Sequence, residues 1–191
     1  MATLPPLSLA LSSSETLANA LSTLFESSPV LFSKLVPQLS ALFTAPPSTY
    51  TALIDLAITT IAAWDFPTKA AFIAAHPRIG ESANLSHLSR QEQAAKVVPP
   101  EVLARLEVLN GVYEKRYPGL RYITFVNGRS RAEVRDEMEA VLGVEEEVGG
   151  SAVEDVLPVE VGGKAWMEEL DRAIVDMGRI AKSRLRALGA L

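Results

Sequence analysis

YTALIDLAITTIAAW, residues 50–64, is the stretch that decides the fold, because it is the longest predominantly apolar run in the chain. Its apolar side chains recur at helical spacing, at Tyr50, Leu53, Ile54, Ala57, Ile58 and Ile61. Several of them are β-branched and would also suit a strand, but about fifteen unbroken residues favour a helix. The run is too short for a membrane span and contains Asp55, so it predicts one helix of a packed core.

The segments on both sides of this run also show helical periodicity, with residues that begin or end helices at their limits. We expect helices within residues 12–29, 29–43, 67–75, 99–119, 130–143 and 165–188. LRYITFVNG, residues 120–128, is the segment that we expect to be extended, because β-branched and aromatic residues precede an Asn-Gly turn. The predicted fold class is therefore all-α, a compact irregular bundle of about eight helices with one short extended segment.

Length and composition predict a single domain. The chain has 191 residues, of which 48% are hydrophobic and 21% are charged, as in an ordinary globular protein with a substantial core. We expect residues 1–14 to form an N-terminal arm. Residues 143–163 contain an acidic run, several glycines and a proline, and we expect them to form a long exposed loop.

Charge and cysteine content exclude several classes of function. The net charge of −5 is spread along the chain, which argues against non-specific binding of nucleic acid. The absence of cysteine excludes disulfides, zinc–thiolate sites and a cysteine nucleophile. No apolar run suits a bilayer, and the N-terminus lacks the basic region of a secretory signal. We expect an intracellular location, cytoplasmic or peroxisomal, although the C-terminus carries no SKL-type signal.

His76 is the candidate for proton transfer. It lies in AAHPRIGE, residues 74–81, after an apolar helical segment and before Pro77, which ends the helix. Taken alone, a histidine at a helix end is more often structural, because it can bond the free carbonyls there. A metal site has less support, since His87 is not at helical spacing and no acidic residue completes a ligand set.

SRQEQ, residues 89–93, allows two interpretations. Ser89 and Glu92 fit a capping box, which is a complete structural explanation. The same helix start would place Glu92 and Gln93 where anions bind. A carboxylate within reach of His76 would make its imidazole a tunable acid or base near neutral pH.

Arginines in two other segments are candidates for anion binding. NGRSR, residues 127–131, follows a turn, and we expect Arg131 to be solvated. The cations of RIAKSRLRAL, residues 179–188, mostly complement the helix dipole at the surface. Arg184 is the exception, because it adjoins the apolar stripe of its helix and is expected to point toward a pocket.

Four motifs, taken in order, resemble the OHCU decarboxylase family, the 2-oxo-4-hydroxy-4-carboxy-5-ureidoimidazoline decarboxylases of urate breakdown. HPRIGE (76–81) is similar to the family's His-Pro-x-x-Gly, and SRQEQA (89–94) is similar to its Ser-x-x-Glu-Gln. Residues 109–134 resemble the block in which Asn-x-x-Tyr leads into an extended segment and Gly-Arg. Residues 179–188 resemble the closing Ile-x-x-x-Arg-Leu, so the resemblance covers roughly residues 15–188.

The resemblance implies a carboxy-lyase without a cofactor or metal, commonly a homodimer, that converts the small molecule OHCU to (S)-allantoin and carbon dioxide. His76 would be the catalytic acid/base, and Glu92 would bond to it or to the substrate. Arg184 would hold the departing carboxylate or another anionic oxygen. The other substrate-binding residues that the resemblance implies are Pro77, Ser89, Arg90, Gln91, Gln93, Tyr122, Ile123, Thr124, Phe125 and Val126. Neither nucleic acid nor a membrane is an expected partner.

The chain also departs from the family's pattern. Residues 117–120, Tyr-Pro-Gly-Leu, stand where the family commonly has an aromatic-Gly-aromatic stretch, and the 143–163 loop is longer than usual. Two alternative functions stay open. One is a non-catalytic helical protein that binds a ureide or purine-like ligand on the same scaffold. The other is a related enzyme that acts on a different ureidoimidazoline or hydantoin acid.

Overall fold

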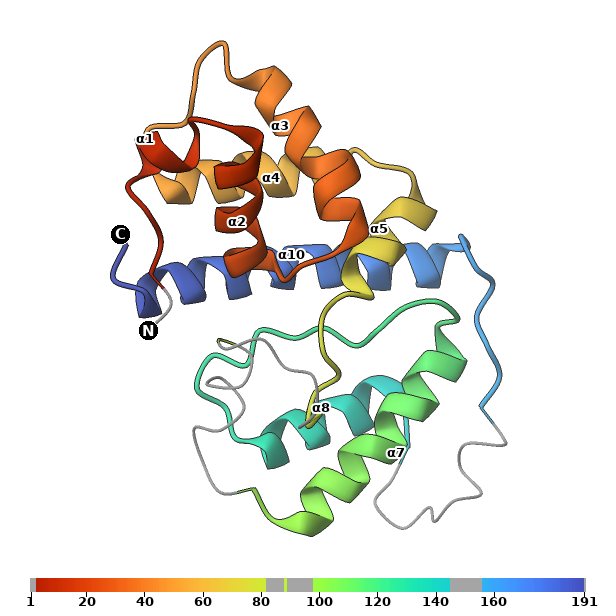
Figure 1. Ribbon diagram of the computed structural model, residues 1–191. Helices are drawn as coiled ribbons and strands as arrows, with labels where there is room; N and C mark the ends of the chain where they lie inside the picture. Colours follow the sequence, from red (N-terminus) through yellow and green to blue (C-terminus); the bar gives the residue numbers. More distant parts are fainter. Residues whose placement is uncertain (1–2, 82–87, 89–97, 145–155, 191) are drawn as a thin grey trace.

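The computed structural model describes residues 3–81, 88, 98–144 and 156–190. Within these residues the chain forms eight α-helices and one π-helical turn. In chain order they are α1 (Leu7–Ala10), α2 (Ser14–Phe25), η1 (Leu31–Leu35), α3 (Val36–Leu42), α4 (Tyr50–Ala62), α5 (Phe66–Ile73), α7 (Pro100–Arg116), α8 (Arg131–Leu142) and α10 (Lys164–Ala187) (Figure 1). The described part of the chain contains no strand, and the predicted all-α class is confirmed.

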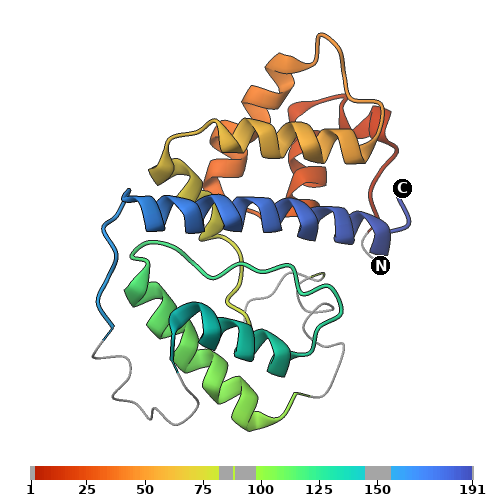
Figure 2. The ribbon, with the colours of Figure 1, turned by 180° about the vertical axis from the view of Figure 1, so that it is seen from behind.

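Helix α10 runs across the middle of the molecule and separates two groups of helices (Figures 1 and 2). Helices α1 to α5 lie on one side, where α2, α4 and α5 pack directly on α10. Helices α7 and α8 pack on each other on the opposite side. The extended segment after α7 runs between α10 and the pair α7 and α8.

Polar caps begin several of these helices where the sequence predicts them. Ser13 accepts a hydrogen bond from the Thr16 N–H at the start of α2. Ser130 and Glu133 form a capping box at the start of α8, within the helix predicted over residues 130–143. Gly143 ends α8 in the left-handed conformation that glycine adopts most easily. These local interactions fix the direction in which α8 leaves the extended segment.

The helix predicted over residues 29–43 is present but contains a wider turn. Val36 N–H donates to the Leu31 carbonyl, five residues earlier, and residues 31–35 form η1. Pro37 follows directly and has no N–H, so it leaves the Ser33 carbonyl without its α-helical donor. A π-helical turn at this point adapts the helix to that missing bond.

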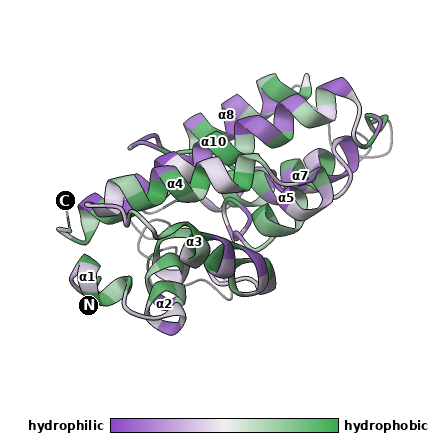
Figure 3. Ribbon diagram, turned by 90° about the horizontal axis from the view of Figure 1, so that it is seen from above, coloured by the Kyte–Doolittle hydropathy of each residue, from purple (hydrophilic) through white to green (hydrophobic). Residues whose placement is uncertain are grey.

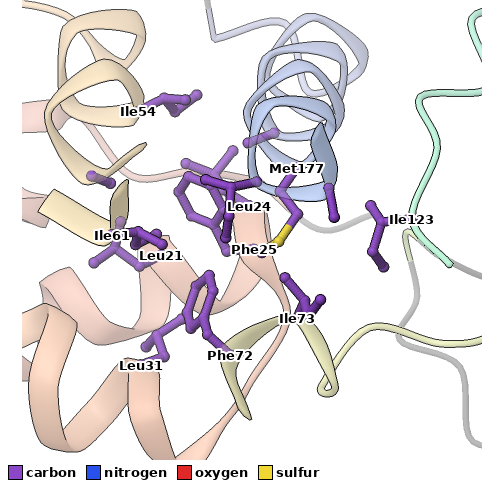
Figure 4. Close-up of a cluster of buried hydrophobic side chains, with 14 of the residues drawn as sticks. Leu21, Leu24, Phe25, Leu31, Ile54, Ile61, Phe72, Ile73, Ile123 and Met177 are labelled. Carbon is purple, nitrogen blue, oxygen red and sulfur yellow. The ribbon is translucent and has the colours of Figure 1, made fainter. Parts of the chain in front are cut away.

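The core lies where the apolar face of α10 meets α2, α4 and α5 (Figure 4). Phe25, Phe72 and Met177 are almost fully buried there, and their side chains come from three different helices. Ile123, from the extended segment, lies at the edge of this cluster on the side of Met177. Hydrophobic and hydrophilic residues alternate along α8 and α10 (Figure 3), as expected for helices with one buried face. The core therefore holds one side of the extended segment in place.

Helices α10 and α4 approach each other closely at Gly178. A Cβ atom at this position would lie 3.0 Å from Cγ1 of Ile58 in α4. Residues 50–64, which the sequence identified as a core helix, thus contain α4 (Tyr50–Ala62), which packs against α10. No helix in the described ranges is long and apolar enough to span a membrane.

The segment predicted as an N-terminal arm includes the short helix α1 and packs on the bundle. The hydroxyl of Tyr50 in α4 donates to the Pro5 carbonyl at 2.8 Å. Ala10, at the end of α1, is fully buried. The arm is therefore part of the folded domain in its described portion.

The structure describes residues 143–144 and 156–163 of the loop predicted over 143–163. Val159 N–H donates to the Arg116 carbonyl at 2.9 Å, and Nη1 of Arg116 donates to the Leu157 carbonyl at 3.2 Å. Leu157 itself is exposed. These bonds fasten the last part of the loop to the end of α7 before α10 begins.

Candidate active site

A cavity of about 490 Å³ lies where the loop after α5, the extended segment, the start of α8 and the end of α10 meet. This volume is in the range of small-molecule sites in proteins. Several residues that the sequence predicted as functional line it together, namely His76, Pro77, residues 122–126 and Arg184. Residues from three separate parts of the sequence therefore converge on one site.

His76 lies in a turn just beyond α5. Its main-chain N–H donates to the Ile73 carbonyl at 3.0 Å, and its side chain is buried, with 4% of the residue exposed. Neither ring nitrogen has a hydrogen-bond partner among the described residues. Buried polar atoms without partners are costly, so a ring in this state at a cavity wall is well suited to bond a bound molecule.

Two hydrogen bonds from other segments hold the main chain of the loop that carries His76. Nη1 of Arg121 donates to the His76 carbonyl. Nδ2 of Asn110, from α7, donates to the Ile79 carbonyl at 3.0 Å. Gly80 has a φ of 83°, a conformation that L side chains rarely adopt. The His-Pro-x-x-Gly motif thus has a local reason for its glycine, and the Asn-x-x-Tyr motif supplies a bond that positions the loop.

His76 is in an environment that opposes its protonation. Burial and the positive charges of Arg184 and Arg121 lower its pKa from 6.5 to about 3, although the Glu26 carboxylate acts in the opposite direction. The imidazole is therefore neutral at neutral pH before a ligand binds. A neutral imidazole has one donor and one acceptor nitrogen, so it can accept a proton and also donate a hydrogen bond.

Arg184 reaches the cavity from α10, as the sequence predicted, and is only 3% exposed. Its Nη2 lies 2.8 Å from Oε1 of Glu26, and its Nη1 donates to the Leu24 carbonyl at 3.4 Å. The guanidinium is thus held at the C-terminal end of α2, where a cation also complements the helix dipole.

Glu26 is a functional candidate that the sequence did not reveal. It follows α2 directly, is 7% exposed, and has φ 68° and ψ 151°. Residues other than glycine rarely adopt this backbone conformation, which costs about 1–3 kcal/mol. The sequence ESSP at residues 26–29 suggested only a helix end. A buried carboxylate there could be found only once α10 was placed beside α2.

The extended segment ends in the Asn-Gly turn that the sequence predicted. Asn127 and Gly128 have φ values of 49° and 79°, the combination of positive angles found in type I′ turns. Arg129 N–H closes the turn by donating to the Val126 carbonyl at 3.0 Å. The turn reverses the chain and brings the start of α8 to the cavity.

Side chains, rather than a partner strand, hold the extended segment among the described residues. Phe125 N–H donates to Oδ2 of Asp176 in α10 at 3.2 Å. Nη2 of Arg129 donates to the Phe125 carbonyl at 2.6 Å and to Oγ1 of Thr124 at 2.9 Å. Ile123 and Thr124 line the cavity, and no hydrogen bond within the described residues engages their main-chain N–H groups. Their N–H groups are among the main-chain donors at the cavity that a ligand could use.

A buried polar network links α10 to α7 and to the extended segment. The hydroxyl of Tyr113 donates to Oε1 of Glu169 at 2.5 Å, and Nη2 of Arg172 lies 2.6 Å from the same oxygen. Arg172 also stacks over the Tyr122 ring, 5.3 Å from its centroid, and bonds Asp176. Burial and the Glu169 carboxylate raise the pKa of Tyr113, so its hydroxyl stays protonated and continues to donate.

The expectation that Arg131 is solvated is wrong. Arg131 is the first residue of α8, is 8% exposed and lines the cavity. Arg129 also lies inward and forms an ion pair with Glu137. The physical reason is the Asn-Gly turn together with the cap at Ser130, which direct the start of α8 inward instead of into solvent.

The predicted residues of SRQEQ lie outside the described residues; they are Ser89, Arg90, Gln91, Glu92 and Gln93. Their place in the site, including the expected partnership of Glu92 with His76, stays a prediction. Within the described ranges, the carboxylate that acts on the charge of His76 is that of Glu26.

The fold and the cavity define an all-α protein with a small-molecule site, in which a neutral imidazole lies beside a buried guanidinium. The family model for OHCU decarboxylase matches residues 11–148, and the chain belongs to this family. The resemblance seen in the sequence motifs is thereby confirmed. Arg184 lies beyond the matched residues, so its candidacy depends on the closing motif and on the geometry of the cavity.

The fold is similar to that in a crystal structure of (S)-allantoin synthase. The alignment has a TM-score of 0.57 and 20% sequence identity, and it covers 98% of this chain and 54% of that chain. The present chain thus spans about half the length of that protein, and the likeness shows a shared fold. The comparison with curated protein sequences finds no match.

Proposed function

We propose that the protein decarboxylates OHCU to (S)-allantoin and carbon dioxide in the breakdown of urate. The observation that carries this proposal is the convergence of His76, Arg184 and residues 122–126 on one cavity. Membership of the OHCU decarboxylase family supports it. The structural neighbour is an (S)-allantoin synthase, a name that is in keeping with the same product.

Arg184 and the extended segment have the chemistry needed to bind OHCU. The substrate carries a carboxylate, which a guanidinium can hold with charge-assisted hydrogen bonds. Its ureido and ring groups offer amide-like donors and acceptors, and the main chain of Ile123 and Thr124 lines the same cavity. We propose that Pro77, Tyr122, Phe125 and Val126 shape the remaining wall, and that Ser89 to Gln93 hold the ureido and ring groups.

His76 then carries out the proton transfers. When the bond to the carboxylate carbon breaks, its electron pair enters a ring already conjugated to an imine and a carbonyl, and carbon dioxide leaves. The electron pair ends on the imine nitrogen of the ring, which takes up the one proton that the overall reaction draws from solvent. His76, neutral before binding, accepts the proton of the substrate hydroxyl and returns it to the neighbouring ring carbon, with Glu92 as its partner. A fixed imidazole on one side of the ring would determine the stereochemistry.

One assay tests the proposal. OHCU is generated in situ from urate with urate oxidase and hydroxyisourate hydrolase, and chiral allantoin is followed by circular dichroism. We expect wild-type protein to accelerate formation of the (S)-enantiomer and His76→Asn to reduce the rate about 10²–10⁴-fold. An unchanged thermal midpoint for the variant serves as the control for folding.

If wild type and His76→Asn give the same rate and racemic allantoin, the decarboxylase proposal fails. Calorimetric binding of a ureide without turnover would then favour the non-catalytic binding protein. Turnover of a different hydantoin acid would favour the related enzyme.

The homodimer implied by the family is a further part of the proposal. Light scattering after size-exclusion chromatography should give twice the chain mass of 20.6 kDa. A mass equal to that of one chain, at the concentration used for the activity assay, would contradict it.

A further inference from the structure

We propose that Glu26 is a positioning residue that holds the Arg184 guanidinium at the cavity wall beside His76. This inference rests on the proposed function, in which Arg184 binds the substrate carboxylate. Glu26 itself does not line the cavity, so we infer that it affects substrate binding through Arg184.

The contacts of Arg184 support this assignment. The guanidinium comes from α10, and two acceptors at the end of α2 receive it, the Glu26 carboxylate at 2.8 Å and the Leu24 carbonyl at 3.4 Å. Both partners of the ion pair are buried, at 3% and 9% side-chain exposure. A long arginine side chain has many rotamers, and a buried carboxylate removes most of them by selecting one.

The backbone at Glu26 indicates that its side chain is needed at this point. Within the described residues, Glu26 and Asn127 are the non-glycine residues with positive φ. Asparagine is common in such turns, whereas glutamate has no backbone preference for them. Glycine would fit the conformation of residue 26 more easily. A glutamate held there against its backbone preference is explained by the charge that it brings to Arg184.

Glu26 also offsets the charge of Arg184 inside the protein. A buried charge without a partner is strongly unfavourable, and a displaced guanidinium would no longer face a substrate carboxylate next to His76. A guanidinium has five N–H donors in a fixed plane. Its pairing with Glu26 is therefore compatible with simultaneous binding of a second carboxylate in the cavity.

The test is a double-mutant cycle in the OHCU assay. We expect Glu26→Ala to lower kcat/KM about 10- to 100-fold, mainly through a higher KM, because Arg184 would contact the substrate before the reaction starts. In an Arg184→Met background the same change at residue 26 should alter kcat/KM less than about twofold, since the residue through which Glu26 acts is absent. Glu26→Gly should lose as much activity as Glu26→Ala although its backbone fits better.

The control is Glu139→Gln. It breaks the ion pair between Arg105 in α7 and Glu139 in α8. The side chains of this pair are 14% and 13% exposed, so the control also removes a largely buried ion pair. This variant should keep the wild-type KM. An equal rise of KM in the control, a loss confined to kcat, or the same loss from Glu26→Ala in both backgrounds would overturn the proposal.

A stability cycle separates this inference from the proposed function. If wild type does not form (S)-allantoin, the proposed function fails, and the thermal midpoints of the same four proteins still test the pair. We expect Glu26→Ala to lower the midpoint strongly and Arg184→Met to recover part of that loss in the double variant. Additive midpoint changes would show that Glu26 does not hold Arg184 and would overturn the inference by themselves.

Discussion

At the scale of single residues, the charge state of His76 follows from where the chain places it. The imidazole is surrounded by apolar walls and lies near two arginines, Arg184 and Arg121. Burial and the two arginines oppose a positive charge on the imidazole, while the Glu26 carboxylate partly offsets their effect. A histidine that the sequence identified by its neighbour Pro77 is therefore uncharged in the folded protein at neutral pH.

Protonation of His76 should couple stability to pH. Its pKa is about 3 in the folded chain and about 6.5 when unfolded, so between these values the unfolded chain binds more protons. Stability is therefore lost as pH falls below 6.5, by at most about 1.4 kcal/mol per pH unit. Urea unfolding should show that wild type loses about 2 kcal/mol more than His76→Asn between pH 7 and pH 5. Parallel pH profiles for the two proteins would contradict this.

The sequence identified residues that line the cavity better than it identified the residues that bind to them. His76 and Arg184 could be predicted because each lies in a short local motif. Glu26 could not, because its partner Arg184 is distant in the chain and no local pattern marks a buried carboxylate after α2. Arg131 was assigned to solvent because a turn precedes it, whereas the inward direction of α8 depends on tertiary packing.

At the scale of elements, the extended segment owes its shape to α10. Oδ2 of Asp176 accepts the Phe125 N–H and an N–H of Arg172, and its Oδ1 accepts from Arg179. This single buried carboxylate connects a helix to a segment that has no sheet to support it among the described residues. The peptide groups of the cavity wall therefore depend on α10.

Asp176→Asn should weaken that connection. The amide keeps the shape but removes the charge that faces two arginines, so we expect a loss of about 1–3 kcal/mol in unfolding free energy and a higher KM for OHCU. Glu168→Gln makes the same chemical change on the exposed side of α10, where Glu168 is 67% exposed. The control should change stability by less than about 1 kcal/mol. Equal effects of the two variants in urea unfolding would refute the role of Asp176.

Gly178 should be essential for the contact between α10 and α4. Gly178→Val would press against Ile58, which lies 3.0 Å from the Cβ position, and should lower the unfolding free energy by about 2 kcal/mol. Adding Ile58→Ala should recover part of this loss. Gly111 in α7 has no atom within 4 Å of its Cβ position, so Gly111→Ala should raise stability by about 0.5–1 kcal/mol. Thermal denaturation that ranks these variants in another order would contradict the packing argument.

Helices were easier to predict from the sequence than the bonds between them. Serine caps and apolar spacing are local signals, and they located α2, α4 and α8 closely. The wider turn η1 was not predicted, because the effect of Pro37 depends on how the helix before it adjusts. The extended segment was recognised by its β-branched and aromatic residues, but its support by Asp176 comes from α10, which is distant in the chain.

At the scale of the whole molecule, α10 lies between two helix groups and contacts both (Figure 1). On the α7 side the buried bond between Tyr113 and Glu169 is one of the links. Glu169, Arg172 and Asp176 lie one helical turn apart on α10 and face this side. The apolar residues of α10 that lie in the core face the group formed by α1 to α5, so opposite sides of α10 contact the two helix groups.

Removing the Tyr113 hydroxyl should destabilise the helix group of α7 and α8 and leave the group of α1 to α5 unchanged. Tyr113→Phe leaves the buried Glu169 carboxylate with one partner fewer, at a cost of about 1–3 kcal/mol. Hydrogen exchange should become faster in α7 and α8 than in α4. Tyr50→Phe removes the bond to Pro5 on the opposite side and should affect α1 instead. Uniform acceleration in both variants would show that α10 does not divide the molecule in this way.

The contact of Arg184 with the end of α2 has a consequence for how the chain folds. Arg184 and Leu24 are 160 positions apart, so their meeting requires a long loop to close, which is slow compared with the formation of neighbouring helices. Helical signal should therefore recover during refolding before catalytic competence does. We expect this contact to form after the transition state, so substitutions at this junction should mainly speed unfolding and leave the refolding rate almost unchanged. The active site would then be the last part of the molecule to be completed and the first to be lost.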